Sequence, residues 1–153
     1  MASHSGLLNR LIRTSDDPAL TLLRLVLGIV MLPHAAQKTF GWFGGPGFSG
    51  FVGLVGSHFG IPAGFAVLTI AAELLGSLGL LLGLLGRVAA FGILCNMLVA
   101  IALIHRHFGF FMNWTGQQPG EGFEYHLLVI GIATVIVLRG SGAASIDRKV
   151  SGT

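Results

Sequence analysis

Four long apolar stretches, separated by shorter polar or glycine-rich segments, dominate the pattern of this chain. They run over about 19–37, 62–85, 88–104 and 123–138. About 20 mostly apolar residues in a helix, each rising about 1.5 Å, cross the hydrocarbon core of a bilayer. The pattern therefore predicts an all-α protein, a transmembrane four-helix bundle in which residues 1–153 form a single integral membrane domain.

Proline and glycine residues mark the ends of these stretches. Asp17 followed by Pro18 is a typical N-cap and first-turn pair, and it predicts the start of the first span. Gly86 and Arg87 leave room only for a tight turn, so the second and third spans should form an antiparallel hairpin. The segment 39–61 is rich in glycine and phenylalanine, and it predicts an interfacial loop or half-helix between the first two spans.

Both ends of the chain are polar. Apolar residues recur at helical spacing within 7–12 and predict a short amphipathic helix on the membrane surface. The tail 139–153 is expected to be frayed or to lie on the surface. A cleaved signal peptide is an alternative for the first span, since Ala35 and Ala36 resemble a processing site, but Arg24 within the stretch counts against cleavage.

The composition favours a membrane protein over a soluble one. Hydrophobic residues make up 53% of the chain and charged residues only 10%, whereas an ordinary soluble domain has about 25% charged residues. Cys95 is the single cysteine, which excludes an intrachain disulfide, a C-x-x-C redox pair and haem attachment through C-x-x-C-H. No covalent cofactor motif remains, and Cys95 is interpreted as a small buried hydrophobe.

The basic residues predict an orientation in the membrane and not nucleic-acid binding. The net charge is only +3, and the basic residues are scattered at the ends of the apolar stretches. With four spans, seven of the nine basic residues lie on the side of the termini, so the positive-inside rule places both termini in the cytoplasm. The seven are Arg10, Arg13, Arg24, Arg87, Arg139, Arg148 and Lys149, and the remaining two are Lys38 and Arg106.

Small residues on the second span favour close approach of helix backbones. Gly79 and Gly83 stand in a G-x-x-x-G spacing, with Gly76 and Gly86 on either side. Packing within one chain is the first interpretation, and a homodimer seam is the alternative.

Glu73 is the most informative residue of the second span. It lies about 17 Å along the helix, close to the bilayer midplane. Inserting an acidic group there costs about 2.5 to 3.5 kcal/mol. Because Ala66, Ser77 and Leu80 share its helix face, Glu73 is expected to point into the bundle.

A polar face is also predicted on the first span. Arg24, His34 and Lys38 fall within an arc of about 120°. Two interpretations of Arg24 are open: it climbs to pair with Glu73, or it extends to the cytoplasmic headgroups. Asn96, at midplane depth on the third span, is expected to hydrogen-bond across the bundle, mainly as a structural contact.

Titratable residues crowd the outer end of the predicted bundle. Such groups near a membrane face bind a metal, relay protons or hold a quinone headgroup, although exposed interfacial histidines are the simplest interpretation. Their spacing matches no strong metal-binding motif, so no metal site is predicted. The residues are His34, Lys38, His58, His105, His107, Glu121, Glu124 and His126.

Several short motifs together resemble the DoxX family of bacterial four-helix membrane proteins. They extend from Arg24 to Asp147, and one departs from the family, which usually reads His-Gly where this chain has His34-Ala35. The motifs are Arg24 with Gly28, His34-Ala35-Ala36-Gln37-Lys38, Phe40-Gly41-Trp42-Phe43-Gly44-Gly45, Gly60-Ile61-Pro62, Ala72-Glu73-Leu74-Leu75-Gly76, Gly86-Arg87, His105 before Gly109-Phe110-Phe111, Met112-Asn113-Trp114, Gly122-Phe123-Glu124-Tyr125-His126 and Gly140 with Ser145-Ile146-Asp147.

The resemblance implies a redox setting. DoxX proteins are described as subunits of quinol oxidases or thiosulfate:quinone oxidoreductases, and some as membrane parts of complexes with soluble partners. The polar residues that the resemblance implies to be shared are Arg24, His34, Lys38, Glu73, His105 and Glu124. Of these, His105 falls opposite Asn96 on an ideal helix, and a break in the helix before His105 would remove this conflict.

The sequence thus leads to a multi-pass subunit of a quinone-linked oxidoreductase system in the bacterial inner membrane. Glu73 and Arg24 are the candidate catalytic residues, and quinone is the expected ligand. Because the chain encodes no electron carrier, it is not expected to be catalytic alone, and it needs a protein partner or homo-oligomer. The candidate ligand-binding residues are His34, Lys38, Asn96, His105, Glu124 and His126.

Two other classes of function remain. The first is a non-catalytic membrane anchor or assembly partner, in which Glu73 and Arg24 form a structural ion pair. The second is a transporter of small solutes or lipids, which ranks lowest because no inverted repeat or broken-helix pattern is visible.

Overall fold

The computed structural model describes residues 6–152, and within them the protein is entirely helical. Seven α-helices and two short 3-10 helices are present, and the described residues contain no strand. The elements are α1 (Leu7–Ile12), α2 (Pro18–Phe40), η1 (Trp42–Gly44), α3 (Gly47–Phe59), α4 (Ala63–Leu82), α5 (Gly86–Leu103), η2 (His105–Phe108), α6 (Glu124–Arg139) and α7 (Ile146–Ser151).

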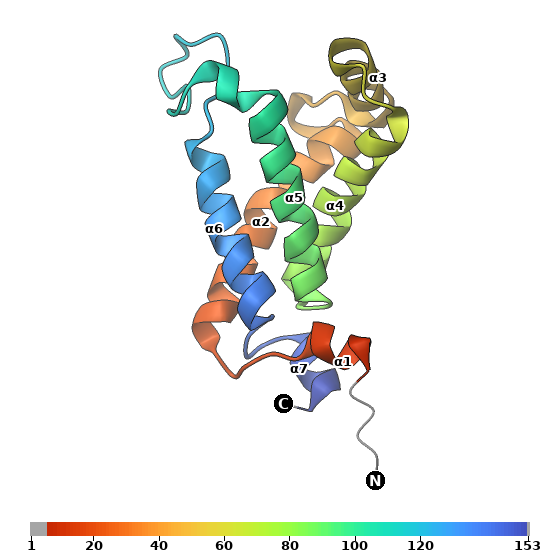
Figure 1. The fold of residues 1–153 in the computed structure, drawn as a ribbon, viewed down its shortest axis with the longest axis vertical. Coiled ribbons are helices and arrows are strands. Elements are labelled where there is room, and N and C mark those ends of the chain that lie inside the picture. Colours follow the sequence, from red (N-terminus) through yellow and green to blue (C-terminus); the bar gives the residue numbers. More distant parts are fainter. Residues whose placement is uncertain (1–5, 153) are drawn as a thin grey trace.

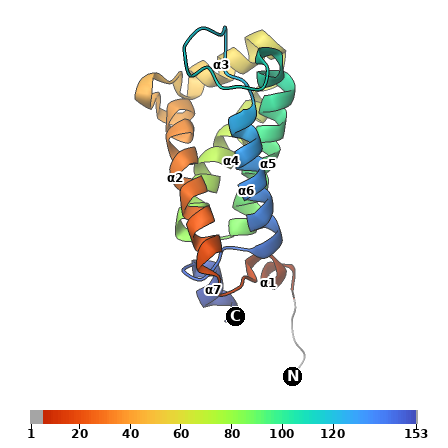
Figure 2. The same ribbon diagram turned by 90° about the vertical axis from the view of Figure 1, so that its left-hand side faces the viewer.

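The helices α2, α4, α5 and α6 run side by side along the long axis of the molecule (Figure 1). Helix α2 packs against α4 and α6, and α5 packs against α4 and α6. The short helices α1 and α7 contact each other at one end, while α3 and the segment after η2 lie at the other end (Figure 2).

Three of these helices are long and apolar enough to cross a membrane: α2 with 23 residues, α4 with 20 and α5 with 18. The protein therefore has the helices of a membrane protein, as its composition predicts. Helix α6 has only 16 residues, in agreement with the expectation that the stretch 123–138 is the shortest of the four.

The start of α2 follows the expected cap. The Asp17 carboxylate accepts a hydrogen bond from the Ala19 backbone N–H at 2.8 Å, and Pro18 occupies the first turn. The helix continues to Phe40, beyond the predicted end at residue 37, and stops at Gly41, whose φ of 73° is left-handed.

The segment between α2 and α4 contains a helix, as one of the two predicted alternatives states. Helix α3 has 13 residues, none of them buried, and it packs against α2 and α4. The chain returns from α2 to α3 so closely that a side chain at Gly45 would overlap Gln37. Glycine at this position therefore permits the return.

The predicted hairpin of the second and third spans is confirmed. Helix α4 ends at Leu82, three residues before the expected end, and α5 starts at Gly86. The early end follows from Gly83, whose φ of 66° ends the helix in the left-handed conformation. Leu85, with a φ of 50°, completes the turn.

The expectation that the tail is frayed or superficial is wrong, because part of it is buried against this hairpin. Asp147 is 1% exposed. Its carboxylate accepts hydrogen bonds from the backbone N–H groups of Leu85 at 2.7 Å and Gly86 at 2.9 Å, and from Ser141 Oγ at 2.6 Å. Asp147 thus supplies from the tail the cap that the first turn of α5 lacks locally.

The glycines of α4 pack within the chain, as the first interpretation states. Gly76 lies against Ile93 and Ala89 of α5, and Gly79 lies against Ala89. A side chain at Gly83 would overlap Ser145 of the tail. Close backbone approach is what holds helices together where lipid removes the hydrophobic driving force.

We predict that Asp147→Ala lowers the free energy of unfolding by about 3 kcal/mol, because it leaves buried donors without an acceptor. The matched control is Asp16→Ala. Asp16 is 64% exposed and pairs with Arg148 at 2.6 Å, so its loss should cost less than about 1 kcal/mol. Thermal unfolding in detergent measures both variants, and equal losses would contradict the role of Asp147.

Candidate functional site

A cavity of about 280 Å³ lies at the α3 end of the protein. Helix α3 and the start of α4 line it with apolar side chains, among them Phe51, Phe59 and Phe65. Polar side chains from α2, α4, α5, η2 and α6 line the same cavity. These polar residues are His34, Lys38, Thr69, Glu73, Asn96, His105, Glu121, Tyr125 and His126.

The Glu73 carboxylate, on α4, is the buried centre of this polar lining. Its side chain is 2% exposed, and it accepts hydrogen bonds from Lys38 Nζ of α2 at 2.7 and 2.9 Å. Asn96 Nδ2 of α5 donates to the same carboxylate at 2.7 Å. The expectations that Glu73 points into the bundle and that Asn96 bonds across it are therefore confirmed.

Lys38 is held on two sides. Besides Glu73, it contacts Phe51 of α3, with Nζ 5.7 Å from the ring centroid, a cation–π distance. An ammonium group has three N–H donors, and the two contacts to Glu73 use two of them. One donor thus remains for a hydrogen-bond acceptor that enters the cavity.

Two imidazoles in contact, with their ring planes tilted by 42°, form a second polar group in the cavity. The ring centroids of His105 and His126 are 4.0 Å apart. His105 Nδ1 lies 2.8 Å from the carbonyl oxygen of Glu121, and because a carbonyl only accepts, this nitrogen carries the proton. His126 is 6% exposed, and its Nδ1 has no hydrogen-bond partner among the described residues.

The helix breaks before His105, which removes the conflict between His105 and Asn96 on an ideal helix. Helix α5 ends at Leu103, and Ile104 has non-helical angles (φ −122°, ψ −65°) that lead into η2. As a result, Asn96 and His105 line the same cavity, although they would face opposite ways on one regular helix.

His34 and Tyr125 close the side of the cavity between α2 and α6. Their ring centroids lie 5.8 Å apart, and the Tyr125 hydroxyl lies 3.6 Å from the Met31 sulfur. His34 therefore lines the cavity and contacts the Tyr125 ring.

Glu124 stands apart from the cavity lining, although the sequence places it among the candidate ligand-binding residues. Its carboxylate accepts hydrogen bonds from the Met112 backbone N–H at 2.9 Å and from Trp114 Nε1 at 3.1 Å. These contacts hold the segment between η2 and α6 in place. Glu124 therefore affects the cavity indirectly, by positioning Met112 of this segment in the cavity lining.

Arg24 lies at the opposite end of the bundle, and its expected pairing with Glu73 is wrong. It is 1% exposed, and its guanidinium donates to the carbonyl oxygens of Leu80, Leu81, Ser141 and Ala144. The alternative, a side chain reaching the headgroups, does not hold either. Instead, the Arg24 side chain binds backbone carbonyl oxygens at the end of α4 and in the tail that no helical hydrogen bond uses. A helical projection does not show these carbonyl groups.

The structure adds residues to the predicted site. Tyr125 contacts His34, and Phe51 contacts Lys38. Neither aromatic residue is charged, so neither was among the candidate site residues of the sequence. Tyr125 adjoins His126 in the chain, which is the one signal available. Within residues 6–152, no three His, Cys, Asp or Glu side chains come together in a group that holds a metal ion.

We predict that Glu73→Gln lowers the free energy of unfolding by about 3 kcal/mol, because Lys38 loses its counter-charge while Asn96 keeps an acceptor. This value is at the lower end for a buried pair, since Lys38 is 22% exposed. The double variant Lys38→Met with Glu73→Gln should recover more than half of the loss. Strictly additive losses in a double-mutant cycle, measured by denaturant unfolding in micelles, would contradict a coupled pair.

Comparison with known proteins gives one match. The family model described as DoxX matches residues 19–106, which run from the start of α2 into η2. No curated protein and no solved structure matches the chain. The match covers α2, α3, α4 and α5, four of the helices that line the cavity, and with them Lys38, Glu73 and Asn96. It shows that the chain belongs to the DoxX family.

Proposed function

We propose that this protein is a membrane subunit of a quinone-linked redox system and that its cavity binds the quinone headgroup. One observation carries the proposal: a single cavity joins apolar walls to a Lys38–Glu73–Asn96 group centred on a buried carboxylate and to a pair of histidines in contact. Ligand sites of this kind, mostly apolar with a few converging polar groups, are typical for small amphipathic molecules.

A quinone fits this arrangement of donors and apolar surface. Its ring carries two carbonyl acceptors, which match the remaining Lys38 donor and the unpartnered His126 nitrogen. Phe65, Val99 and Leu103 line the cavity and are also exposed on the outside of α4 and α5. An apolar tail therefore has a path from the cavity into lipid along these two helices.

The residues of this chain have separable roles in such a site. A bound quinone supplies the capacity to carry two electrons and two protons. Lys38, fixed by Glu73 and Asn96, donates a hydrogen bond to the ring. His126 Nδ1 and the unprotonated His105 Nε2 hold and pass protons next to it. We assign the supply of electrons to a partner protein, because the sequence has no cysteine pair for a redox disulfide or attached haem.

We further propose that α6 is a fourth membrane span and that both termini lie in the cytoplasm of a bacterial cell, at its inner membrane. Helix α6 packs along α5 and α2 over the same depth (Figure 1). The described end with α1 and α7 carries Arg10, Arg13, Arg148 and Lys149, as the positive-inside rule requires.

A second candidate function is a non-catalytic anchor or assembly partner. It is favoured by large aromatic side chains exposed at the α3 end: Trp114 is 84% exposed and Phe43 72%. Aromatic residues of this kind dock protein partners or sit in the interfacial layer of the membrane.

We predict that purified protein binds a short-chain ubiquinone analogue and that His126→Leu weakens this binding at least tenfold, because the quinone loses a hydrogen-bond donor in the cavity. His107→Leu is the matched control, since His107 is exposed and lies outside the cavity lining. Equilibrium titration of both variants measures the effect. Absence of binding by a folded wild-type protein, or equal weakening by both variants, would favour the anchor function.

The topology is tested with single cysteines in a Cys95→Ser background. Gln117→Cys, in the segment before α6, should react with a membrane-impermeant maleimide added to intact cells. Val150→Cys, in α7, should react only after the cells are permeabilised, because α6 separates the two positions. Labelling of both positions in intact cells would show that α6 does not cross the membrane.

A further inference from the structure

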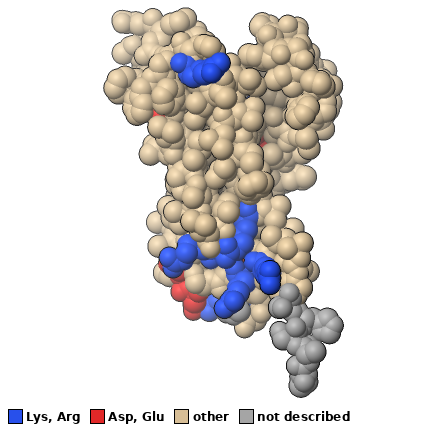
Figure 3. Space-filling model, viewed as in Figure 1, with Lys and Arg blue, Asp and Glu red and all other residues tan. Residues whose placement is uncertain are grey.

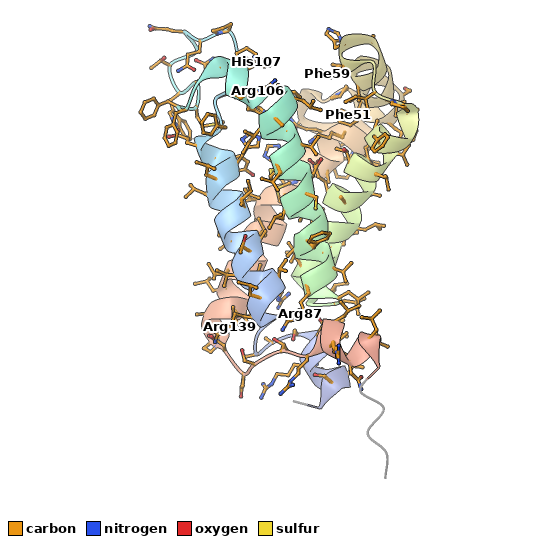
Figure 4. The ribbon with its side chains drawn as sticks, in the orientation of Figure 1. Phe51, Phe59, Arg87, Arg106, His107 and Arg139 are labelled. Carbon is orange, nitrogen blue, oxygen red and sulfur yellow. The ribbon has the colours of Figure 1, made fainter. Side chains whose placement is uncertain are left out.

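A second hollow lies at the end of the protein away from the cavity. It is an open groove of about 400 Å³ between the α1–α2 linker, the start of α5 and the end of α6. Figure 4 labels Arg87 and Arg139 at this end of the molecule, where both line the groove. The lining residues are Arg13, Thr14, Ser15, Arg87, Leu138 and Arg139.

The groove has three guanidinium charges and no carboxylate among its described lining residues, and the charge of buried Asp147 acts on Arg87 only through space, without an ion pair. Among residues 6–152, no acidic side chain lies within ion-pairing distance of Arg13, Arg87 or Arg139. In Figure 3, the basic side chains gather over this end of the molecule. The groove therefore has a positive potential, which attracts an anion from outside the chain.

The acidic residues of this end are engaged elsewhere. Asp16 pairs with Arg148, Asp17 caps α2, and Asp147 caps α5 beneath the tail. None of the three can form an ion pair in the groove without giving up a contact that stabilises the fold. The groove arginines therefore lack an acidic partner because of the fold itself, and a rotamer change of one side chain would not supply one.

Arg87 is positioned before any ligand arrives. Its guanidinium donates to the carbonyl oxygens of Arg13, Val137 and Leu138. Carbonyl oxygens fix the orientation of the planar group but leave its full positive charge in place. Beside it, Ser15 Oγ is buried with no hydrogen-bond partner among the described residues, so the groove also offers an unused hydroxyl.

The surroundings of the groove place it at the boundary between hydrocarbon and headgroups. Leu138 in its lining is 68% exposed, and Leu7 and Leu8 of the neighbouring α1 are 74% and 60% exposed. Exposed leucines on a short helix beside basic residues are typical of an element lying in the membrane interface. Acyl chains can therefore cover the leucines while the phosphate of the same lipid reaches the arginines.

From these observations we infer that the groove is a binding site for the phosphate group of an anionic phospholipid. Arg13 and Arg139 close on the phosphate oxygens from either side, and Arg87 and the Ser15 hydroxyl donate from the floor. A lipid source is favoured over free phosphate because apolar side chains adjoin the arginines, and a soluble anion would leave them uncovered.

The test uses the full chain in detergent and native mass spectrometry, with phosphatidylglycerol as the probe. Arg13→Gln with Arg139→Gln should weaken phosphatidylglycerol binding at least tenfold, since each basic residue near an anionic headgroup contributes a several-fold gain in affinity. The matched control is Arg10→Gln with Lys149→Gln. It removes the same charge from the same end, at exposed positions outside the groove, and should weaken binding less than twofold.

Two further arms identify the ligand. Phosphatidylcholine should bind wild-type protein at least tenfold more weakly, and 10-fold excess inorganic phosphate should leave the phosphatidylglycerol adduct in place. Equal losses in the two double variants would show diffuse attraction and overturn the site. Displacement of the lipid by inorganic phosphate would overturn the lipid as its occupant. Unfolding curves of the variants that match wild type ensure that lost binding reports the groove.

Discussion

A carboxylate in an apolar environment must be neutralised or hydrogen-bonded, and the way Glu73 meets this constraint organises one half of the protein. Three donors from two other helices converge on it, two contacts from Lys38 of α2 and one from Asn96 of α5. The ion pair and the amide together fix the relative height of α2, α4 and α5. Burial of such a charge costs several kcal/mol when it is unpaired, so these helices slide past each other only by losing the pair. A cavity with a stable shape forms next to them as a consequence.

The other half of the protein obeys the same rule with different groups. Arg24 is buried without a carboxylate in contact, and backbone carbonyls at the end of α4 and in the tail satisfy it. Asp147 does the converse, since backbone N–H groups at the start of α5 satisfy its charge. Both residues use the unpaired backbone groups that every helix end exposes. The chain termini are thereby joined to the α4–α5 turn without a direct ion pair between the two residues.

The sequence predicts much of the fold because its apolar stretches and helix breakers act locally. The hairpin turn, the Asp17 cap and the inward face of Glu73 are all confirmed. The partner of Arg24 and the burial of the tail were not predictable, because both depend on backbone groups brought together from distant parts of the chain. The same holds for the Lys38–Glu73 pair: each residue was identified, but helical projection gives the face of a side chain and not the height at which α2 and α4 meet.

Helix α3 differs from the four bundle helices that line the cavity, because it buries no residue of its own and holds its place through contacts with α2 and α4. Its link to the rigid polar centre is the face of the Phe51 ring against Lys38. In the proposed quinone site, the bundle helices therefore set which headgroup is accepted, and α3, which has no buried residue, sets how large a molecule the cavity admits. Closely related chains that vary in α3 would accordingly share a headgroup preference and diverge in the size of molecule they admit.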